Sequence, residues 1–104
     1  MIMNEKVLYN YFRNLVNRFF KILPMREEEE KTLVTYMQSL QSELIGCNEV
    51  VESINNDPSY LTLIAVLQYL IDNSFESPLV FRREVFHCIN ICNKLSALYT
   101  KGEV

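Results

Sequence analysis

A chain of 104 residues with 49% hydrophobic and 22% charged residues has the composition of a single folded domain and is too apolar for disorder. Its two glycines and three prolines are too few for the frequent turns of a β-sandwich, and no segment reaches the roughly 18 apolar residues of a membrane span. The formal net charge of −3 disfavours a nucleic-acid-binding protein, which normally carries a strongly basic balance.

The first predicted helix begins at Asn4, a good N-cap residue, and ends at Leu23, because Pro24 disfavours its continuation. Its apolar residues recur at alternating spacings of four and three, which places them on one helix face. These residues are Leu8, Phe12, Leu15, Phe19 and Ile22.

The second predicted helix covers residues 27–54. Four glutamates at 27–30 suit a first helical turn, where exposed N–H groups carry a partial positive charge. The same apolar spacing then continues through Leu33, Met37, Leu40, Leu44, Cys47, Val51 and Ile54. We expect one long helix, bent if anywhere at Gly46. A straight helix of this length would reach about 42 Å, so it either breaks near Gly46 or overhangs the domain and meets another subunit.

Two further helices are predicted after proline-containing starts. Asp57 and Pro58 begin the third, which is apolar almost all round and therefore expected at the centre of the fold. Ser77 and Pro78 begin the fourth, which closes at residues 101–102. Its apolar positions are Phe81, Val85, Cys88, Cys92, Leu95 and Tyr99. The sequence thus predicts one all-α domain over residues 1–104, a compact bundle of about four helices with a long second helix.

The stretch FRREVFHCINIC, residues 81–92, holds the only histidine and two of the three cysteines. If Cys88 and Cys92 face the core, then Arg83, His87 and Lys94 face water. His87 and Cys88 lie about 100° apart around the helix, whereas a nucleophilic Cys–His pair needs the two side chains in contact. We therefore expect no catalytic residue in this protein.

Metal sites are also not expected, although the sequence offers partial ligand sets. Glu84 and His87 form a Glu-x-x-His pair, but di-iron bundles use two such pairs and the chain has one histidine. A homodimer could supply the second pair, with further ligands from Glu43, Glu49 or Glu52.

Zinc could be bound by Cys47, Cys88, Cys92 and His87, yet no C-x-x-C motif is present. Consecutive glutamates at 27–30 splay around a helix and do not converge on calcium. We predict no metal or cofactor, with a metal-dependent helical protein using Glu84 and His87 across a dimer as an alternative.

A second alternative is a small nucleic-acid-associated regulator. Basic residues interleave with aromatic ones along the first helix and the turn after it: Arg13, Arg18, Lys21 and Arg26. In an acidic protein we expect these residues to pair with the acidic second helix, so a nucleic-acid partner is not favoured.

The main hypothesis is a non-enzymatic protein–protein interaction module that forms a homodimer. Phe20 and Phe86 fall outside the predicted apolar faces, and aromatic residues are enriched at the centres of interfaces. Together with the water-facing residues of the last helix they give the candidate partner-binding residues Phe20, Arg83, Phe86, His87 and Lys94.

The runs FFKILPMREEEEKTLVTYMQSLQSELIG (19–46) and RREVFHCINICNKL (82–95) resemble small helical proteins of Gram-positive bacteria and their phages or mobile elements. This resemblance implies a cytoplasmic accessory protein, and it transfers no functional residue. A regulator or an inhibitor would fit the small size of the chain and its lack of catalytic motifs. An odd number of cysteines and an N-terminal stretch without a cleavage-site pattern agree with a reducing cytoplasm and no membrane partner.

Overall fold

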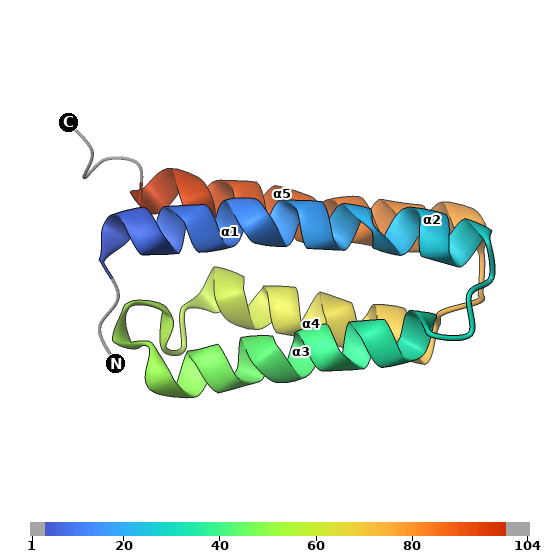
Figure 1. Ribbon diagram of the computed structural model, residues 1–104, viewed down its shortest axis with the longest axis horizontal. Coiled ribbons are helices and arrows are strands. Elements are labelled where there is room, and N and C mark those ends of the chain that lie inside the picture. Colours follow the sequence, from blue (N-terminus) through green and yellow to red (C-terminus); the bar gives the residue numbers. More distant parts are fainter. Residues whose placement is uncertain (1–3, 100–104) are drawn as a thin grey trace.

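The computed structural model describes residues 4–99, and it confirms an all-α bundle of about four helices. The elements are α1 (Glu5–Phe20), α2 (Ile22–Glu27), α3 (Leu33–Val50), the 3₁₀ turn η1 (Glu52–Ile54), α4 (Pro58–Asp72) and α5 (Pro78–Tyr99). α2 continues the direction of α1, so the two helices together form one of the four rods (Figure 1). The predicted closure at residues 101–102 lies outside the described residues. Within the described part of the chain, no helix is both long and apolar enough to cross a membrane.

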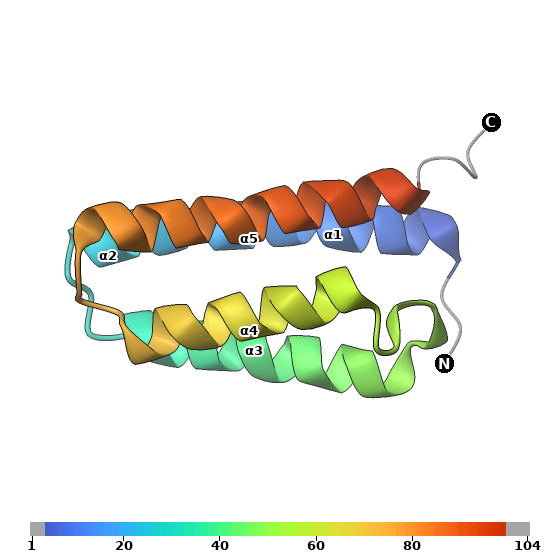
Figure 2. The same cartoon turned by 180° about the vertical axis from the view of Figure 1, so that it is seen from behind.

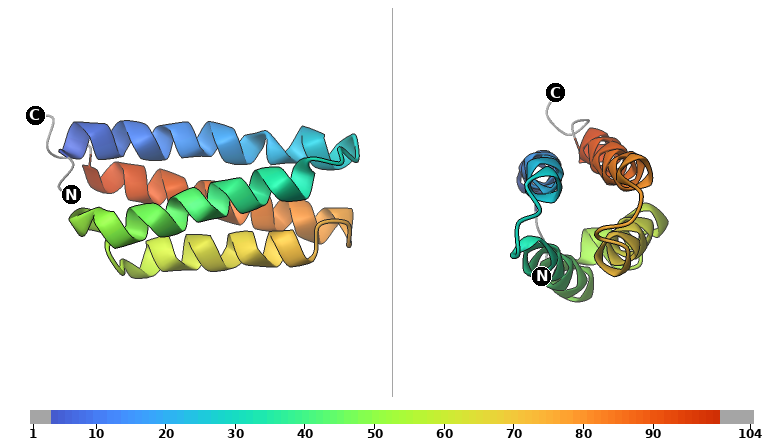
Figure 3. Two further views of the ribbon diagram at one scale, coloured as in Figure 1. Left: turned by 60° about the horizontal axis from the view of Figure 1, so that its bottom comes forward. Right: turned by 90° about the vertical axis from the view of Figure 1, so that its right-hand side faces the viewer.

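The helices form two layers. α1, α2 and α5 make one layer, and α3 and α4 make the other (Figures 1 and 2). Seen from one end, the rods occupy four corners, and each runs antiparallel to its neighbours (Figure 3). α4 therefore has helices on two sides only, with Leu61 and Tyr69 exposed at 41% and 40%. The predicted central position of this apolar helix is wrong.

The predicted apolar faces are confirmed. All five positions of the first helix are at most 1% exposed, and the corresponding positions of α3 and α5 are buried except for Cys47 and Tyr99, which are half-buried. Tyr60 is also fully buried, and its hydroxyl donates to the Leu44 carbonyl at 2.6 Å. Burying one such large apolar side chain stabilises the fold by about 1.5–3 kcal/mol, so these faces hold the bundle together.

Pro24 does not end the first helical segment, contrary to the prediction. α1 ends at Phe20, and the chain continues after Lys21 as α2, passing through Pro24. A proline has no N–H and cannot bond to the carbonyl four residues earlier, which is that of Phe20. The helix is interrupted there, but Pro24 lies in the first turn of α2, where a missing N–H costs little.

The glutamates at 27–30 do not begin a helix, so that expectation is also wrong. α2 ends at Glu27, and Glu29 adopts a positive φ of 51°. The N–H of Glu29 donates to the Arg26 carbonyl at 3.2 Å, and the N–H of Glu30 donates to the Met25 carbonyl at 3.0 Å. These two bonds form a Schellman motif, in which glycine usually occupies the left-handed position. The segment therefore closes α2, and α3 begins only at Leu33.

The prediction of a single helix over residues 27–54 is also wrong at its C-terminal end. α3 passes through Gly46 without a break and ends at Val50. Val51 is extended, and η1 follows it. Val51 and Ile54 are nevertheless 2% and 1% exposed, because the 3₁₀ turn folds back onto the core. The apolar spacing therefore extends past the end of α3 and includes buried residues that lie outside this helix.

Asparagine side chains explain this early end. The side-chain amide of Asn55 donates to the Asn48 carbonyl at 2.7 Å. The backbone N–H of Asn56, which has a φ of 56°, donates to the Asn48 side-chain oxygen at 2.9 Å. Asparagine tolerates the left-handed conformation and competes for backbone groups, so these bonds favour a turn over a further helical turn.

Candidate partner-binding site

Charge is divided between the two layers. The layer of α1, α2 and α5 (residues 5–27 and 78–99, the basic layer) carries eight Lys and Arg against three Glu, a formal charge of +5. Residues 28–77, which contain α3 and α4 (the acidic layer), carry nine Asp and Glu against Lys31 alone, a formal charge of −8. The basic residues are Lys6, Arg13, Arg18, Lys21, Arg26, Arg82, Arg83 and Lys94. Since salt screens exposed charges over about 8 Å, a partner at one face experiences that face and not the net charge of the chain.

An open groove of about 710 Å³ lies on the basic layer between α1 and α5. We call it the α1–α5 groove. Its lining runs on α1 from Tyr9 to Phe20 and on α5 from Phe86 to Ala97. Val16 and Ile89 in this lining are 6% and 4% exposed, so they belong to the core and give the groove an apolar floor.

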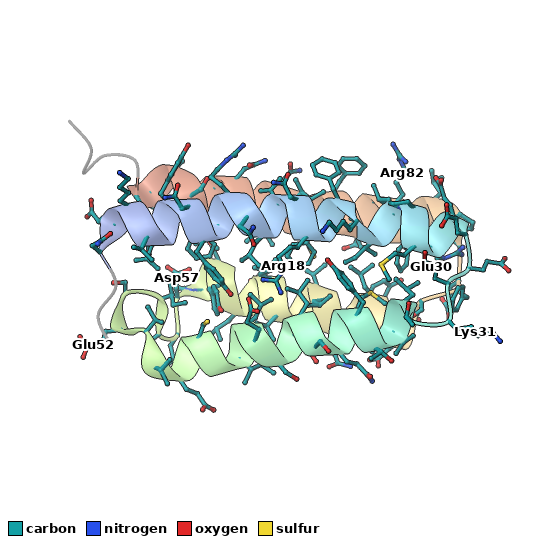
Figure 4. All side chains as sticks on the ribbon, in the orientation of Figure 1. Arg18, Glu30, Lys31, Glu52, Asp57 and Arg82 are labelled. Atoms are coloured by element: carbon teal, nitrogen blue, oxygen red, sulfur yellow. The ribbon has the colours of Figure 1, made fainter. Side chains whose placement is uncertain are left out.

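Two of the predicted partner-binding residues meet in this groove. Phe20 and Phe86 pack edge to face, with ring centroids 5.7 Å apart and planes at 83°. Phe20 remains 43% exposed, and Phe86 is half-buried. The Arg82 guanidinium lies 5.1 Å from the centroid of Phe86, and Figure 4 shows Arg82 on the outer side of α5. The groove thus combines an apolar aromatic pair with a cation beside it.

A hydrogen bond crosses the groove further along. Arg13 Nη1 donates to the side-chain oxygen of Asn93 at 2.7 Å. The bond joins α1 to α5 and leaves other guanidinium N–H groups of Arg13 available, since arginine carries five donors. Arg13 therefore places positive charge in the lining of the groove. Arg82, which lines a neighbouring pocket with Glu27, places a second positive charge beside Phe86 at one end of the groove.

The other three predicted residues lie elsewhere on α5. Arg83, His87 and Lys94 are exposed, as expected, but none of them lines the α1–α5 groove. Arg83 Nε lies 3.3 Å from Glu84 Oε1, and His87 Nδ1 lies 3.4 Å from Glu84 Oε2. Arg83 and Glu84 line a separate, smaller pocket of about 350 Å³ with Tyr69 of α4. The structure therefore brings only Phe20 and Phe86 together in the groove and places Arg83 and His87 around Glu84 instead.

The histidine and the cysteines do not form a nucleophilic pair. Cys88 is fully buried whereas His87 is exposed, so their side chains lie on different sides of α5. Burial raises the pKa of the Cys88 thiol and raises that of Cys92 to about 12. Both thiols stay protonated at neutral pH and act as small apolar residues of the core.

The predicted ligands do not come together within one copy of the chain. Among residues 4–99, no group of three or more His, Cys, Asp or Glu side chains could hold a metal ion. Glu84 and His87 do contact each other, but Arg83 lies against the same carboxylate, and its positive charge would oppose a bound cation.

Of the four basic residues on the first predicted helix and the turn after it, Arg18 pairs with the acidic helix as expected. Its Nη1 and Nη2 donate to the Glu43 carboxylate at 2.7 and 3.1 Å, and Figure 4 shows Arg18 between α1 and α3. The Tyr11 hydroxyl donates to the same carboxylate at 2.8 Å. Hydrogen bonding to Arg18 lowers the pKa of Glu43. The pKa of Tyr11 is raised mainly by its burial and also by its hydrogen bond to Glu43. This cluster joins α1 to α3 and has a structural role.

Arg26 differs from the expectation. It donates from Nη2 to the Glu76 carbonyl at 2.8 Å, and its guanidinium lies over the rings of Phe75 and Phe81 at 5.2 and 5.5 Å. It therefore joins α2 to the segment before α5 and forms no pair with an acidic side chain.

Sequence reasoning missed Arg82 and the role of Arg13. The spacing of Arg82 and Phe86 could have indicated a contact, because residues four apart share a helix face. The pairing of Phe20 with Phe86 required the packing of α1 against α5, which no local pattern shows. No protein-family model, curated protein or solved structure matches this chain.

Proposed function

We propose that this protein is a non-enzymatic interaction module that binds another protein through the α1–α5 groove. The observation that supports this most is the aromatic pair Phe20 and Phe86, which stays partly exposed beside Arg82. Aromatic residues, phenylalanine included, and arginine are enriched in the buried centres of protein interfaces. An apolar floor with charged residues beside it also matches the usual anatomy of a protein interface.

The charge pattern disfavours one form of the homodimer that we expect from the sequence, namely a dimer through the groove. A two-fold contact places the same patch of both copies together. A dimer through the groove would therefore set one basic layer against another, and like charges brought together across an interface cost several kcal/mol. We propose that the groove takes a different protein, and that two copies pair through the sides or ends of the bundle.

A nucleic-acid-associated regulator is the second candidate, because the basic layer removes the objection based on net charge. The exposed basic side chains of this layer could meet phosphates. The groove itself favours a protein, because Phe20 and Phe86 pack against each other and Arg82 covers Phe86, which leaves less ring surface for bases to stack on.

We place the interaction in the cytoplasm, since the three cysteines are unpaired thiols that suit a reducing compartment. We propose an accessory role in a bacterium or phage, which the sequence resemblance implies, and a regulator or inhibitor would fit the small size of the chain. The metal-dependent alternative predicts a stoichiometric metal adduct in a native mass spectrum, which is lost in Glu84→Ala and His87→Ala.

The proposal is tested by affinity capture from an extract of the source cells. The wild-type protein should retain a specific protein that the double variant Phe20→Ala/Phe86→Ala does not. Tyr69→Ala is the matched control, because Tyr69 is a similarly exposed aromatic residue on α4, outside the groove. Circular dichroism must show equal helicity for all three proteins. Equal capture by the double variant and the wild type would contradict the proposal.

A further inference from the structure

The partner of the α1–α5 groove can be specified further by its shape and charge; this step rests on the proposed function. The lining covers residues 9–20 on α1 and 86–97 on α5, about 16 Å of helix on each side at 1.5 Å per residue. A partner helix of about three turns matches this length. Grooves between two helices commonly receive the apolar face of an amphipathic helix.

The charges around the groove specify the polar side of that helix. Arg13, which is exposed, is the charged residue in the described lining of the groove, and the exposed Arg82 lies beside Phe86. The three glutamates of the same layer, Glu5, Glu27 and Glu84, are not part of the described lining of the groove, and Glu84 contacts Arg83 and His87. A partner with carboxylates beside its apolar residues would be attracted, and a basic partner would be repelled.

A second copy of this chain fits the groove less well. Its acidic layer has the complementary charge, but its exposed large apolar residues are divided between two helices and the segment after α4, which carries Phe75. Ile45 and Val50 lie on α3, whereas Leu61 and Tyr69 lie on α4. They form no single apolar ridge of the kind that a groove between helices accepts. Such a contact would also be head to tail, so it would join the copies into a closed ring or an open chain.

We propose that the α1–α5 groove binds an acidic amphipathic helix of another protein. The apolar side chains of that helix contact Val16, Phe20, Phe86 and Ile89, and its carboxylates pair with Arg13 and Arg82. In this complex Phe20 and Phe86 are the anchors, and the two arginines set the sign of the charge that the groove accepts.

The test uses two synthetic helical peptides of about 20 residues with leucines at the same i, i+3, i+4 and i+7 positions. Glutamates flank the leucines in the acidic peptide, and lysines flank them in the basic peptide. Duplex DNA of about 20 base pairs is the third probe. Binding is followed by fluorescence anisotropy at about 0.15 M salt, together with the sedimentation of the protein alone.

We expect the acidic peptide to bind at least tenfold more tightly than the basic one, with a Kd below about 100 µM. Phe20→Ala/Phe86→Ala should weaken this binding at least tenfold, and Arg82→Glu should weaken it several-fold. Lys31→Glu makes the same change in net charge on the loop between α2 and α3 and should leave the affinity within twofold.

The failures are distinguishable. Tighter binding of the basic peptide, lost in Phe20→Ala/Phe86→Ala, would overturn the acidic specificity and leave the groove as a protein-binding site. Binding of DNA with neither peptide bound would overturn both proposals in favour of a nucleic-acid partner. A growing series of oligomers, lost in Arg82→Glu, would show that other copies occupy the groove. No binding of any probe would overturn the assignment of a helix to this groove.

Discussion

Glu29→Gly should stabilise the protein. Glu29 occupies the left-handed position of the Schellman motif that ends α2, with a φ of 51°. The left-handed conformation costs a residue with a side chain about 1–2 kcal/mol. Glycine avoids this cost but gains freedom in the unfolded chain worth about 0.5–1 kcal/mol. The difference predicts a gain of about 0.5–1 kcal/mol in the free energy of unfolding.

Urea denaturation of the wild type and three variants measures this difference. Glu29→Ala should change the stability by less than about 0.5 kcal/mol, because the left-handed conformation is as unfavourable for alanine as for glutamate. Glu28→Gly should lower the stability by about 0.5–1 kcal/mol, because the φ of Glu28 is −84° and glycine offers no relief there. If Glu29→Gly were destabilised as much as Glu28→Gly, the assignment of strain to Glu29 would be refuted.

Three further predictions concern the helices and their contacts. Gly46→Ala should stabilise the protein by about 0.5–1 kcal/mol in urea denaturation, since an added Cβ meets no atom within 4 Å and glycine weakens a helix interior; a loss would show that Gly46 is needed for packing. Leu67→Ala should cost about 2–5 kcal/mol, because Leu67 is 0% exposed, and a cost under 1 kcal/mol would place it outside the core. Glu43→Gln should cost about 0.5–1 kcal/mol at neutral pH, a value reduced by the partial exposure of the pair with Arg18. Because the folded state lowers the pKa of Glu43, this contribution is present above the unfolded pKa and is lost as the pH falls through the folded pKa. Thermal unfolding of both proteins from pH 7 down to pH 3 should therefore show their difference shrinking, and a constant difference would contradict the role of the charge.

The apolar spacing predicted which residues are buried better than it predicted where helices end. Leu33, Met37, Leu40 and Leu44 belong to α3 as expected, whereas Val51 is buried outside any α-helix. Burial follows from the face on which a residue lies, and a 3₁₀ turn keeps that face toward the core. Helix ends depend instead on single hydrogen bonds and backbone conformations, which the spacing does not record.

The glutamate run shows this limit most clearly. Four consecutive carboxylates favour a helix start in an isolated sequence. In the fold, the chain must reverse between α2 and α3, and the Schellman motif does so with Glu29 in place of the usual glycine. The contacts of the complete bundle therefore override the local preference.

The candidate site was predictable only in part. The exposure of Phe20 and the partial exposure of Phe86 follow from their positions off the apolar faces of α1 and α5. Their contact with each other depends on which helices become neighbours. The separation of charge into two layers likewise depends on the pairing of α1 with α5. The net charge of −3 therefore did not indicate that one face of the bundle is basic.

Amide NMR spectra of the isotope-labelled protein, recorded during titration with the acidic peptide, test the central claim most directly. The claim predicts that the largest shift changes cluster at residues 13–20 of α1 and 86–93 of α5, and that α3 and the first half of α4 change little. Shift changes concentrated on α3 and α4, or spread evenly over the bundle, would contradict the assignment of the α1–α5 groove as the partner-binding site.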